Sequence, residues 1–141
     1  MLPQAPEDAG YYVYGTPRTG AGQYAHPAMM SAILRVEREW QAIDERKFGI
    51  GNISLAGGPK YGKHSTHRSG LEVDVRPLRL DGNQVPVYWY QQAYDQVGTA
   101  KLIELFRMYA PVVLIYFNDT HIPFVTPLAD HDHHFHVKLR A

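Results

Sequence analysis

The chain has 141 residues, of which 45 % are hydrophobic and 20 % charged, and these values are typical of one soluble domain with a packed core. Its 14 basic and 14 acidic residues cancel, so no basic field is available to collect nucleic acid or anionic lipid. Cysteine is absent, which excludes disulfides, thiolate metal sites and cysteine nucleophiles. No stretch of about 18 apolar residues occurs, so we expect no membrane span. Six of the 8 histidines fall in two short clusters.

The N-terminal half is expected to form an irregular arm, a helix and a strand. Residues 1–25 are rich in proline and glycine and carry an aromatic patch at Tyr11, which predicts an arm with room for one strand. From residue 27 to about residue 47 a 3.6-residue apolar repeat predicts a helix, and Pro27 suits its first turn. The predicted apolar face holds Met30, Ile33, Leu34, Trp40 and Ile43. Residues 48–55 then form a predicted strand that ends at Gly57-Gly58-Pro59.

The C-terminal half is expected to contain further strands and one helix. Residues 58–69 have almost no apolar side chains and predict a loop, whereas residues 71–75 alternate as a half-buried strand does. Asp81-Gly82 would turn a hairpin between residues 77–80 and 85–88. Further along, the pattern predicts a helix over residues 91–109, a buried strand over 112–117 and a last strand over 135–139. The predicted apolar side of this helix holds Val97, Leu102, Ile103, Phe106 and Tyr109.

This uneven order of helices and strands favours an α+β fold. We expect one domain over residues 1–141, with a central, mostly antiparallel sheet flanked by helices and with residues 1–25 as an irregular arm. No linker, repeat or low-complexity tract divides the chain.

The two histidine clusters are predicted to meet on one face of this sheet. In the last strand, Phe135, Val137 and Leu139 take the core side, so His134 and His136 point to the other face. The same alternation in residues 71–75 sends Asp74 to that open face. His67 lies on the loop that leads into this strand, where Gly70 permits a tight turn.

If the two strands lie side by side, His67, Asp74 and His136 converge. Two imidazoles and one carboxylate form a three-ligand zinc set that leaves the fourth position to water, as in catalytic zinc sites. Zinc would lower the pKa of that water to about 7 and polarise a carbonyl group. His134, one alternation away, is placed to act as base or to stabilise developing charge.

The run His67-x-x-Gly70-x-x-x-Asp74, followed by His134-x-His136, resembles the metallopeptidase superfamily of lysostaphin-type peptidases, D-Ala-D-Ala carboxypeptidases and hedgehog domains. The closer resemblance is to the penicillin-insensitive murein endopeptidases. Those proteins have a Gly-Gly pair before the first cluster, here Gly57-Gly58, and a His-Asp-x-His-Phe-His-Val tail, here residues 131–137.

The resemblance implies a zinc enzyme that cleaves peptide crosslinks of bacterial peptidoglycan, with the D-alanyl–meso-diaminopimelyl bond as the expected target. It implies that one Zn²⁺ ion is bound by His67, Asp74 and His136 and that His134 is the catalytic histidine. His131 and His64 would line the site, orient the water or bind a substrate carboxylate.

Several assignments stay open at this point. Carboxypeptidases of the superfamily have a glutamate base three residues before the last ligand, and here that residue is His133. The base is therefore assigned to His134, with His131 and His133 as alternatives. Three further features have two interpretations each. Arg68 would bind a peptide carboxylate or face solvent, and Glu72 would support a metal ligand or be a solvated carboxylate. The aromatic run Tyr88-Trp89-Tyr90 would form a wall of the substrate groove or be half core and half surface.

Two alternative functions remain, a D-alanyl carboxypeptidase of the same superfamily and a zinc-binding recognition module without activity. The expected partners are peptidoglycan stem peptides, with an inhibitor or immunity protein if the chain is a delivered effector or phage lysin. The expected place of action is the periplasm or cell wall. Because residues 1–20 carry no signal peptide pattern, we expect a mature form, an excised domain, a phage component or a secreted effector.

Overall fold

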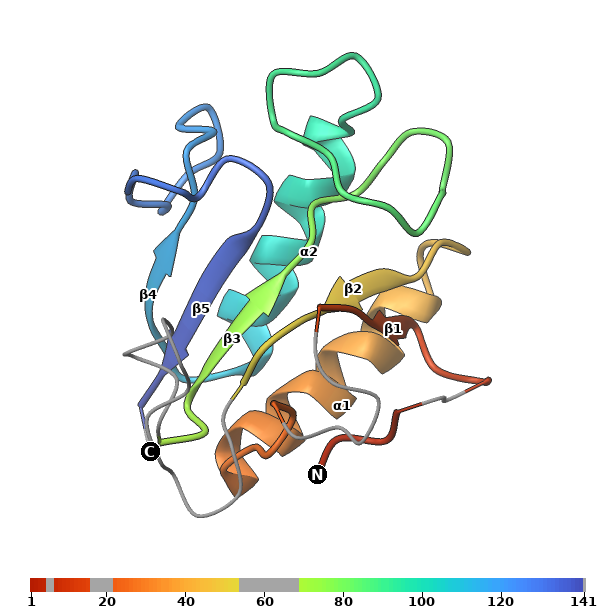
Figure 1. Ribbon diagram of the computed structural model, residues 1–141. Coiled ribbons are helices and arrows are strands. Elements are labelled where there is room, and N and C mark those ends of the chain that lie inside the picture. Colours follow the sequence, from red (N-terminus) through yellow and green to blue (C-terminus); the bar gives the residue numbers. More distant parts are fainter. Residues whose placement is uncertain (5–6, 16–21, 54–68, 141) are drawn as a thin grey trace.

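The computed structural model describes residues 1–4, 7–15, 22–53 and 69–140, which form an α+β domain (Figure 1). Its sheet has the order β1-β2-β3-β5-β4, in which β1 and β2 run parallel and all other neighbours are antiparallel. The prediction of a mostly antiparallel sheet is therefore confirmed. In chain order the elements are β1 (Tyr11–Val13), α1 (Pro27–Gln41), β2 (Phe48–Ile50), β3 (Glu72–Val75), α2 (Gln96–Tyr109), β4 (Val112–Tyr116) and β5 (Phe135–Leu139).

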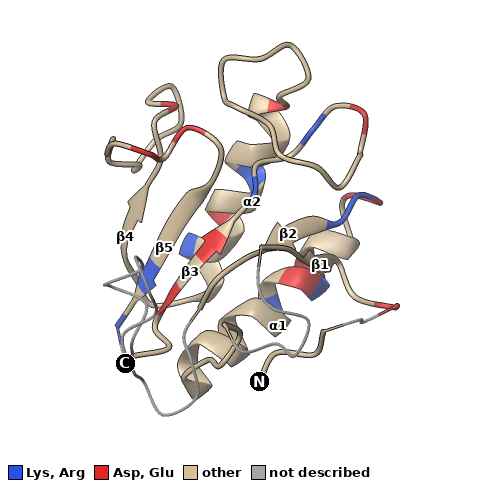
Figure 2. Ribbon diagram, in the orientation of Figure 1, with Lys and Arg blue, Asp and Glu red and all other residues tan. Residues whose placement is uncertain are grey.

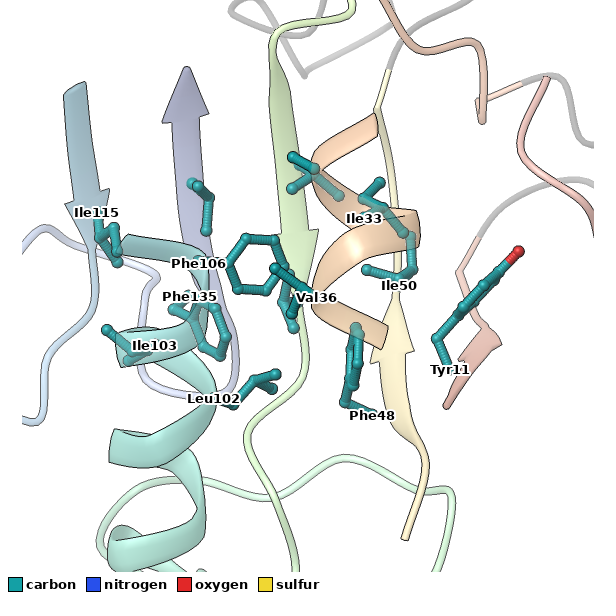
Figure 3. Packing of buried hydrophobic residues seen from close by; sticks show 14 of the residues in the cluster. Tyr11, Ile33, Val36, Phe48, Ile50, Leu102, Ile103, Phe106, Ile115 and Phe135 are labelled. Atoms are coloured by element: carbon teal, nitrogen blue, oxygen red, sulfur yellow. The ribbon is translucent and has the colours of Figure 1, made fainter. Parts of the chain in front are cut away.

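Both helices pack on the same face of the sheet. Figure 3 shows Ile33 and Val36 of α1 and Phe106 of α2 in one cluster of buried side chains, in which the ring of Phe106 lies 6.2 Å from that of Phe135 of β5. Val73, Val75, Phe135 and Val137 are fully buried in this cluster, as the alternation of β3 and β5 predicts. Their neighbours along each strand must therefore lie on the face away from the helices.

Helix α1 begins at Pro27 as predicted but ends at Gln41, several residues before the expected position. The main chain turns there because the N–H groups of Ile43 and Asp44 both donate to the carbonyl oxygen of Trp40. Ile43 is consequently 57 % exposed, and its placement on the buried face was wrong. The following strand is also shorter than predicted, since β2 ends at Ile50.

Helix α2 begins at Gln96 instead of residue 91 because Asp95 caps it, with its carboxylate accepting a hydrogen bond from the N–H of Gly98 at 2.9 Å. Val97 therefore falls in the first turn and is 65 % exposed, not buried as expected. Strand β4 is an edge strand with half-exposed side chains, so its prediction as a buried strand was wrong.

The predicted hairpin at Asp81-Gly82 is not formed. The chain turns there, with the N–H of Gly82 donating to Arg79, but the flanking residues do not pair with each other. Arg79 forms a single bridge with Tyr94 instead. This segment is part of the connection between β3 and α2. Hydrogen bonds from the start of α2 and from Arg46 hold it in place.

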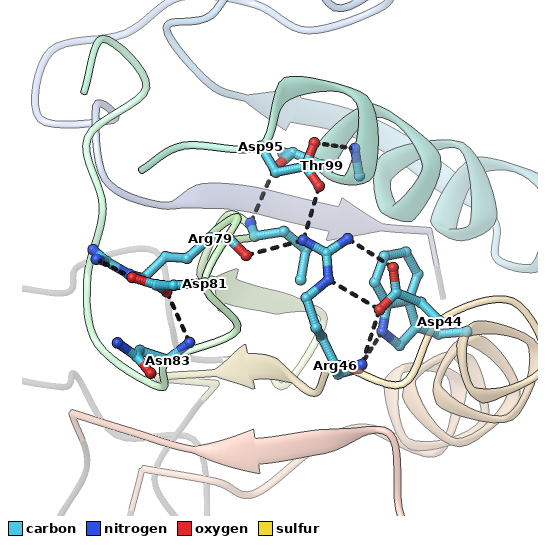
Figure 4. Close-up of polar contacts among 10 residues, drawn as sticks. Asp44, Arg46, Arg79, Asp81, Asn83, Asp95 and Thr99 are labelled. Carbon is cyan, nitrogen blue, oxygen red and sulfur yellow. Dashed lines mark hydrogen bonds and ion pairs between the residues drawn. The ribbon is translucent and has the colours of Figure 1, made fainter. Parts of the chain in front are cut away.

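Arg46 joins three parts of the chain through its guanidinium group (Figure 4). It contacts Asp44 at 2.7 Å and Asp95, the cap of α2, at 2.8 Å, and it donates to the carbonyl oxygen of Arg79 at 2.9 Å. The carboxylates hold the pKa of Arg46 above its usual value. Because its side chain is only 22 % exposed, the pairing is not a weak surface contact.

We expect Arg46→Met to destabilise the protein by about 2–3 kcal/mol, because Asp44 and Asp95 are left facing each other without a cation. In a thermal melt this corresponds to a loss of about 5–10 °C in Tm. Arg35→Met is the matched control, since Arg35 forms an exposed i,i+4 pair with Glu39 and should cost under about 1 kcal/mol. Equal losses for both variants would contradict this role of Arg46.

Candidate active site

The site is built on one cross-strand pair, Asp74 of β3 and His136 of β5, which lie directly opposite each other in the antiparallel register. Both point away from the helices, because their strand neighbours fill the core. His136 Nδ1 lies 3.1 Å from Asp74 Oδ1, and both residues are buried, at 5 % and 8 % exposed. The predicted meeting of these two residues on the face opposite the helices is confirmed.

Glu72 completes the surroundings of His136. Its Oε1 lies 2.9 Å from His136 Nε2, so the imidazole is held between two carboxylates. Burial alone lowers the pKa of His136, but hydrogen bonds to Asp74 and Glu72 outweigh it and raise the pKa to about 9. The two interpretations of Glu72 are thereby resolved, because it is a buried partner of His136 and not a solvated carboxylate.

His134 lies on the same face as His136, with its Nε2 3.8 Å from Asp74 Oδ1. Burial and, to a smaller extent, the neighbouring histidines outweigh the opposing effect of Asp74 and lower the pKa of His134 to about 4. His134 is therefore a neutral imidazole near pH 7, able to accept a proton. His131 completes the group, since its ring centroid lies 4.7 Å from that of His134 and 6.0 Å from that of His136.

His133 precedes β5, which begins at Phe135, so the alternation of the strand does not direct it into the core. Its ring lies 5.4 Å from that of Tyr88 and 4.9 Å from that of His134. His133 thus borders the histidine group on the side of the aromatic run.

Gly70, which leads into β3, adopts a left-handed conformation with φ +74°. A Cβ there would lie 2.5 Å from the main-chain nitrogen of His26, which donates to Gly70 O at 3.0 Å. The predicted need for glycine is confirmed, and the contact joins this turn to the start of α1.

Three predicted site residues, His64, His67 and Arg68, lie outside the described residues. Within the described ranges, no group of three or more His, Asp or Glu side chains is arranged to hold a metal ion. The zinc ligand set therefore stays a prediction, and of its three residues the structure brings Asp74 and His136 together.

Comparison with known proteins adds a decisive observation. The sequence profile of the penicillin-insensitive murein endopeptidases matches residues 4–104, which is most of the chain. The chain belongs to this family. A comparison with curated proteins gives no match. The family match includes the run from His67 to Asp74 and ends before the C-terminal histidines. The place of His136 at the site is supported by the sheet register instead, and that of His134 by its 3.8 Å distance from Asp74.

Membership makes the chain a murein endopeptidase, a peptidase that acts on the peptidoglycan of the cell wall. In the parts of the chain that the structure describes, no helix is long and apolar enough to cross a membrane. Acidic and basic residues are interspersed over the helices and the sheet, as the balanced composition suggests (Figure 2).

In this murein endopeptidase the aromatic run has one inward and two outward side chains. Trp89 packs against the core, whereas Tyr88 and Tyr90 are exposed and their rings lie 5.5 Å apart. The Tyr88 ring stacks near His133, so two exposed tyrosines stand beside the histidine group. The run is half core and half surface, as one interpretation had it, and it borders the histidine group, whereas its place in a substrate groove stays a prediction.

Asp132 holds this aromatic run and the histidine group together. Its Oδ1 accepts hydrogen bonds from Trp89 Nε1 and Asn118 Nδ2, each at 2.9 Å, and its main-chain oxygen accepts one from the Trp89 N–H. The hydrogen bonds from Asn118 and Trp89 keep the pKa of Asp132 below its usual value. Sequence reasoning missed this role, although Asp132 stands inside the histidine cluster.

We expect Asp132→Ala to reduce kcat/KM by about 10- to 100-fold, because His131 and His133 lose the contact that positions them. The free energy of unfolding should fall by about 1–3 kcal/mol. Asp132→Asn is the matched variant, since an amide oxygen still accepts both bonds and should retain most activity. If both variants were equally active, Asp132 would not position the site.

Proposed function

We propose that the chain is a zinc-dependent murein endopeptidase that cleaves the D-alanyl–meso-diaminopimelyl crosslink of peptidoglycan. The observation that carries the proposal is the buried cross-strand pair of Asp74 and His136, a carboxylate and an imidazole held 3.1 Å apart at the predicted ligand positions. The family match supports the peptidase activity and the peptidoglycan substrate. The same ligand pattern supports a place in the lysostaphin and D-Ala-D-Ala metallopeptidase superfamily.

The donor set fits zinc. Ligand atoms about 2.0–2.2 Å from a tetrahedral zinc ion lie about 3.3–3.5 Å from each other. The separation of Asp74 Oδ1 and His136 Nδ1 is within a few tenths of an ångström of this range. His67 is the third ligand in this proposal. Glu72 would hold the other nitrogen of His136, the carboxylate–histidine arrangement that orients zinc ligands in many proteins.

Bound zinc would supply a Lewis acid that activates a water molecule and polarises the scissile carbonyl. His134 takes up the proton that the attacking water loses, through its Nε2, and returns it to the leaving amine. His131 lies against His134 and lines the same side of the site. His133 borders the site beside Tyr88, where it would contact the substrate.

Crosslinked Gram-negative sacculi test this proposal, with the products separated by mass spectrometry. We expect loss of muropeptide dimers and gain of intact tetrapeptide monomers, blocked by a chelator and restored by zinc. Release of free D-alanine with dimers untouched would favour the carboxypeptidase instead. Bound zinc with no cleavage at all would favour the non-catalytic recognition module.

A further inference from the structure

A guanidinium group lies beside the proposed zinc ligands on the same face of the sheet. Arg76 follows β3 directly, and its N–H donates to Gly49 O at 2.9 Å, so the pairing with β2 continues through it. Because side chains two residues apart on a strand share a face, Arg76 lies on the side of Asp74 and Glu72. The Cα atoms of residues two apart on a strand are about 6.5 Å apart.

The guanidinium group of Arg76 lies against the rings of two tyrosines of the N-terminal arm. Its Cζ lies 3.9 Å from the ring centroid of Tyr14 and 6.0 Å from that of Tyr12. These rings cross over β2 at two glycines, since a Cβ at Gly51 would lie 2.8 Å from Tyr14 Cζ and one at Gly49 would lie 2.9 Å from Tyr12 Cζ. The absence of side chains at Gly49 and Gly51 therefore lets the two tyrosines reach the arginine that follows β3.

Arg76 has no acidic partner among the described residues. Arg35, Arg46 and Arg79 each form an ion pair with a carboxylate. Arg76 forms none within the described ranges, and its hydrogen bond to Gln84 O is long, at 3.5 Å. Stacking on an aromatic ring fixes the plane of a guanidinium group and leaves its N–H groups free for a carboxylate.

We propose that Arg76, stacked on Tyr14, binds the free carboxylate of the substrate that lies next to the scissile amide. The identity of this carboxylate rests on the proposed function: in the crosslink, the acylated amine of diaminopimelate stands on a carbon that also carries a carboxylate. One residue of extended peptide spans about 3.3 Å, so a carbonyl at Asp74 and His136 brings this carboxylate within reach of a long side chain two residues along β3.

Two forms of one substrate test the inference. A crosslinked disaccharide-tetrapeptide dimer is prepared with this carboxylate free or converted to a carboxamide. The wild-type protein should cleave the free acid with a kcat/KM about 10- to 100-fold higher, as expected for a charge-assisted bidentate contact. Arg76→Gln and Arg76→Met should cleave both forms at the rate of the amide, and Arg76→Lys should keep part of the preference.

Arg79→Gln is the matched control, since Arg79 lies on the same connection but is paired with Asp81. It should keep the full preference. A preference for the free acid that persists in Arg76→Gln, or an equal loss of kcat/KM on both substrates, would overturn the inference. Thermal melts of each variant establish that the comparison is made between folded proteins.

Binding separates this inference from the proposed function. The Kd of each dimer is measured by calorimetry with His134→Ala, alone and combined with Arg76→Gln. Tighter binding of the free acid that disappears with Arg76→Gln would support the subsite. If the wild-type protein cleaved neither dimer, only the endopeptidase proposal would be refuted. Equal Kd values for both dimers in His134→Ala overturn the subsite whatever the activity.

Discussion

Replacing His136 with alanine is expected to abolish zinc binding and peptidase activity together. His136 is held by a carboxylate on each ring nitrogen, at 3.1 and 2.9 Å. Loss of a partner outside the ligand shell typically costs 10- to 100-fold in metal affinity, so loss of a ligand itself should exceed about 100-fold. The loss of zinc affinity is measured as the zinc content after dialysis and by a competition titration with a chromophoric chelator.

The same substitution removes the imidazole that Asp74 and Glu72 contact inside the buried site, so we also expect a loss of about 3–5 kcal/mol in stability. His136→Asn keeps a polar partner and serves as a second variant if the alanine protein folds poorly. His121→Ala is the histidine control, because that side chain is 74 % exposed and contacts Asp119 instead. Unchanged zinc affinity in a folded His136 variant would refute its assignment as a ligand.

His134→Ala is expected to keep zinc and lose activity, with kcat lower by about 10²- to 10⁴-fold, the usual contribution of a positioned acid–base group. Its side chain faces the site at 3.8 Å from Asp74 but lacks the two short carboxylate contacts of His136. Steady-state cleavage of a crosslinked dimer, with the zinc content measured on the same sample, separates the two effects.

His131→Ala and His133→Ala complete this series, since both were alternatives for the base. We expect each to lose less activity than His134→Ala, because His131 touches the site through His134 and His133 lies toward Tyr88. Full activity in His134→Ala together with loss in one of the others would move the base to that residue.

Side-chain alternation allowed much of this site to be predicted. Apolar residues at every second position of β3 and β5 fixed the core side, and they thereby placed Asp74 and His136 on the opposite face. The direct pairing of these two residues needed the strand order as well, which local sequence does not contain. Gly70 was predictable because its left-handed conformation is costly for any other residue.

The misplaced helix ends and the missing hairpin involve contacts between distant parts of the chain. Arg46 draws Asp44 and Asp95 together, and these two residues mark the turn after α1 and the start of α2. Local apolar periodicity predicted both helices as longer. The predicted hairpin at Asp81-Gly82 is absent because the main chain of Arg79 pairs with Tyr94, and only its side chain contacts the other arm of the turn, at Pro86 O.

The contacts around Arg76 and Asp132 could not be predicted from the sequence. Arg76 contacts Tyr14 because β1 and β2 pair in parallel and because the glycines at positions 49 and 51 leave room for the tyrosine ring. Asp132 has the appearance of one more polar residue in a histidine-rich tail, and its bonds to Trp89 and Asn118 depend on how three loops are placed.

A crystal structure of the protein grown with zinc, measured on both sides of the zinc absorption edge, would show whether the proposed residues bind the ion. We expect one anomalous peak about 2.0–2.2 Å from a carboxylate oxygen of Asp74 and from Nδ1 of His136, with a nitrogen of His67 at a similar distance. His134 would stand beside the ion without ligating it. No peak at this pair in zinc-saturated crystals, or a peak bound by other residues, would refute the proposed zinc site.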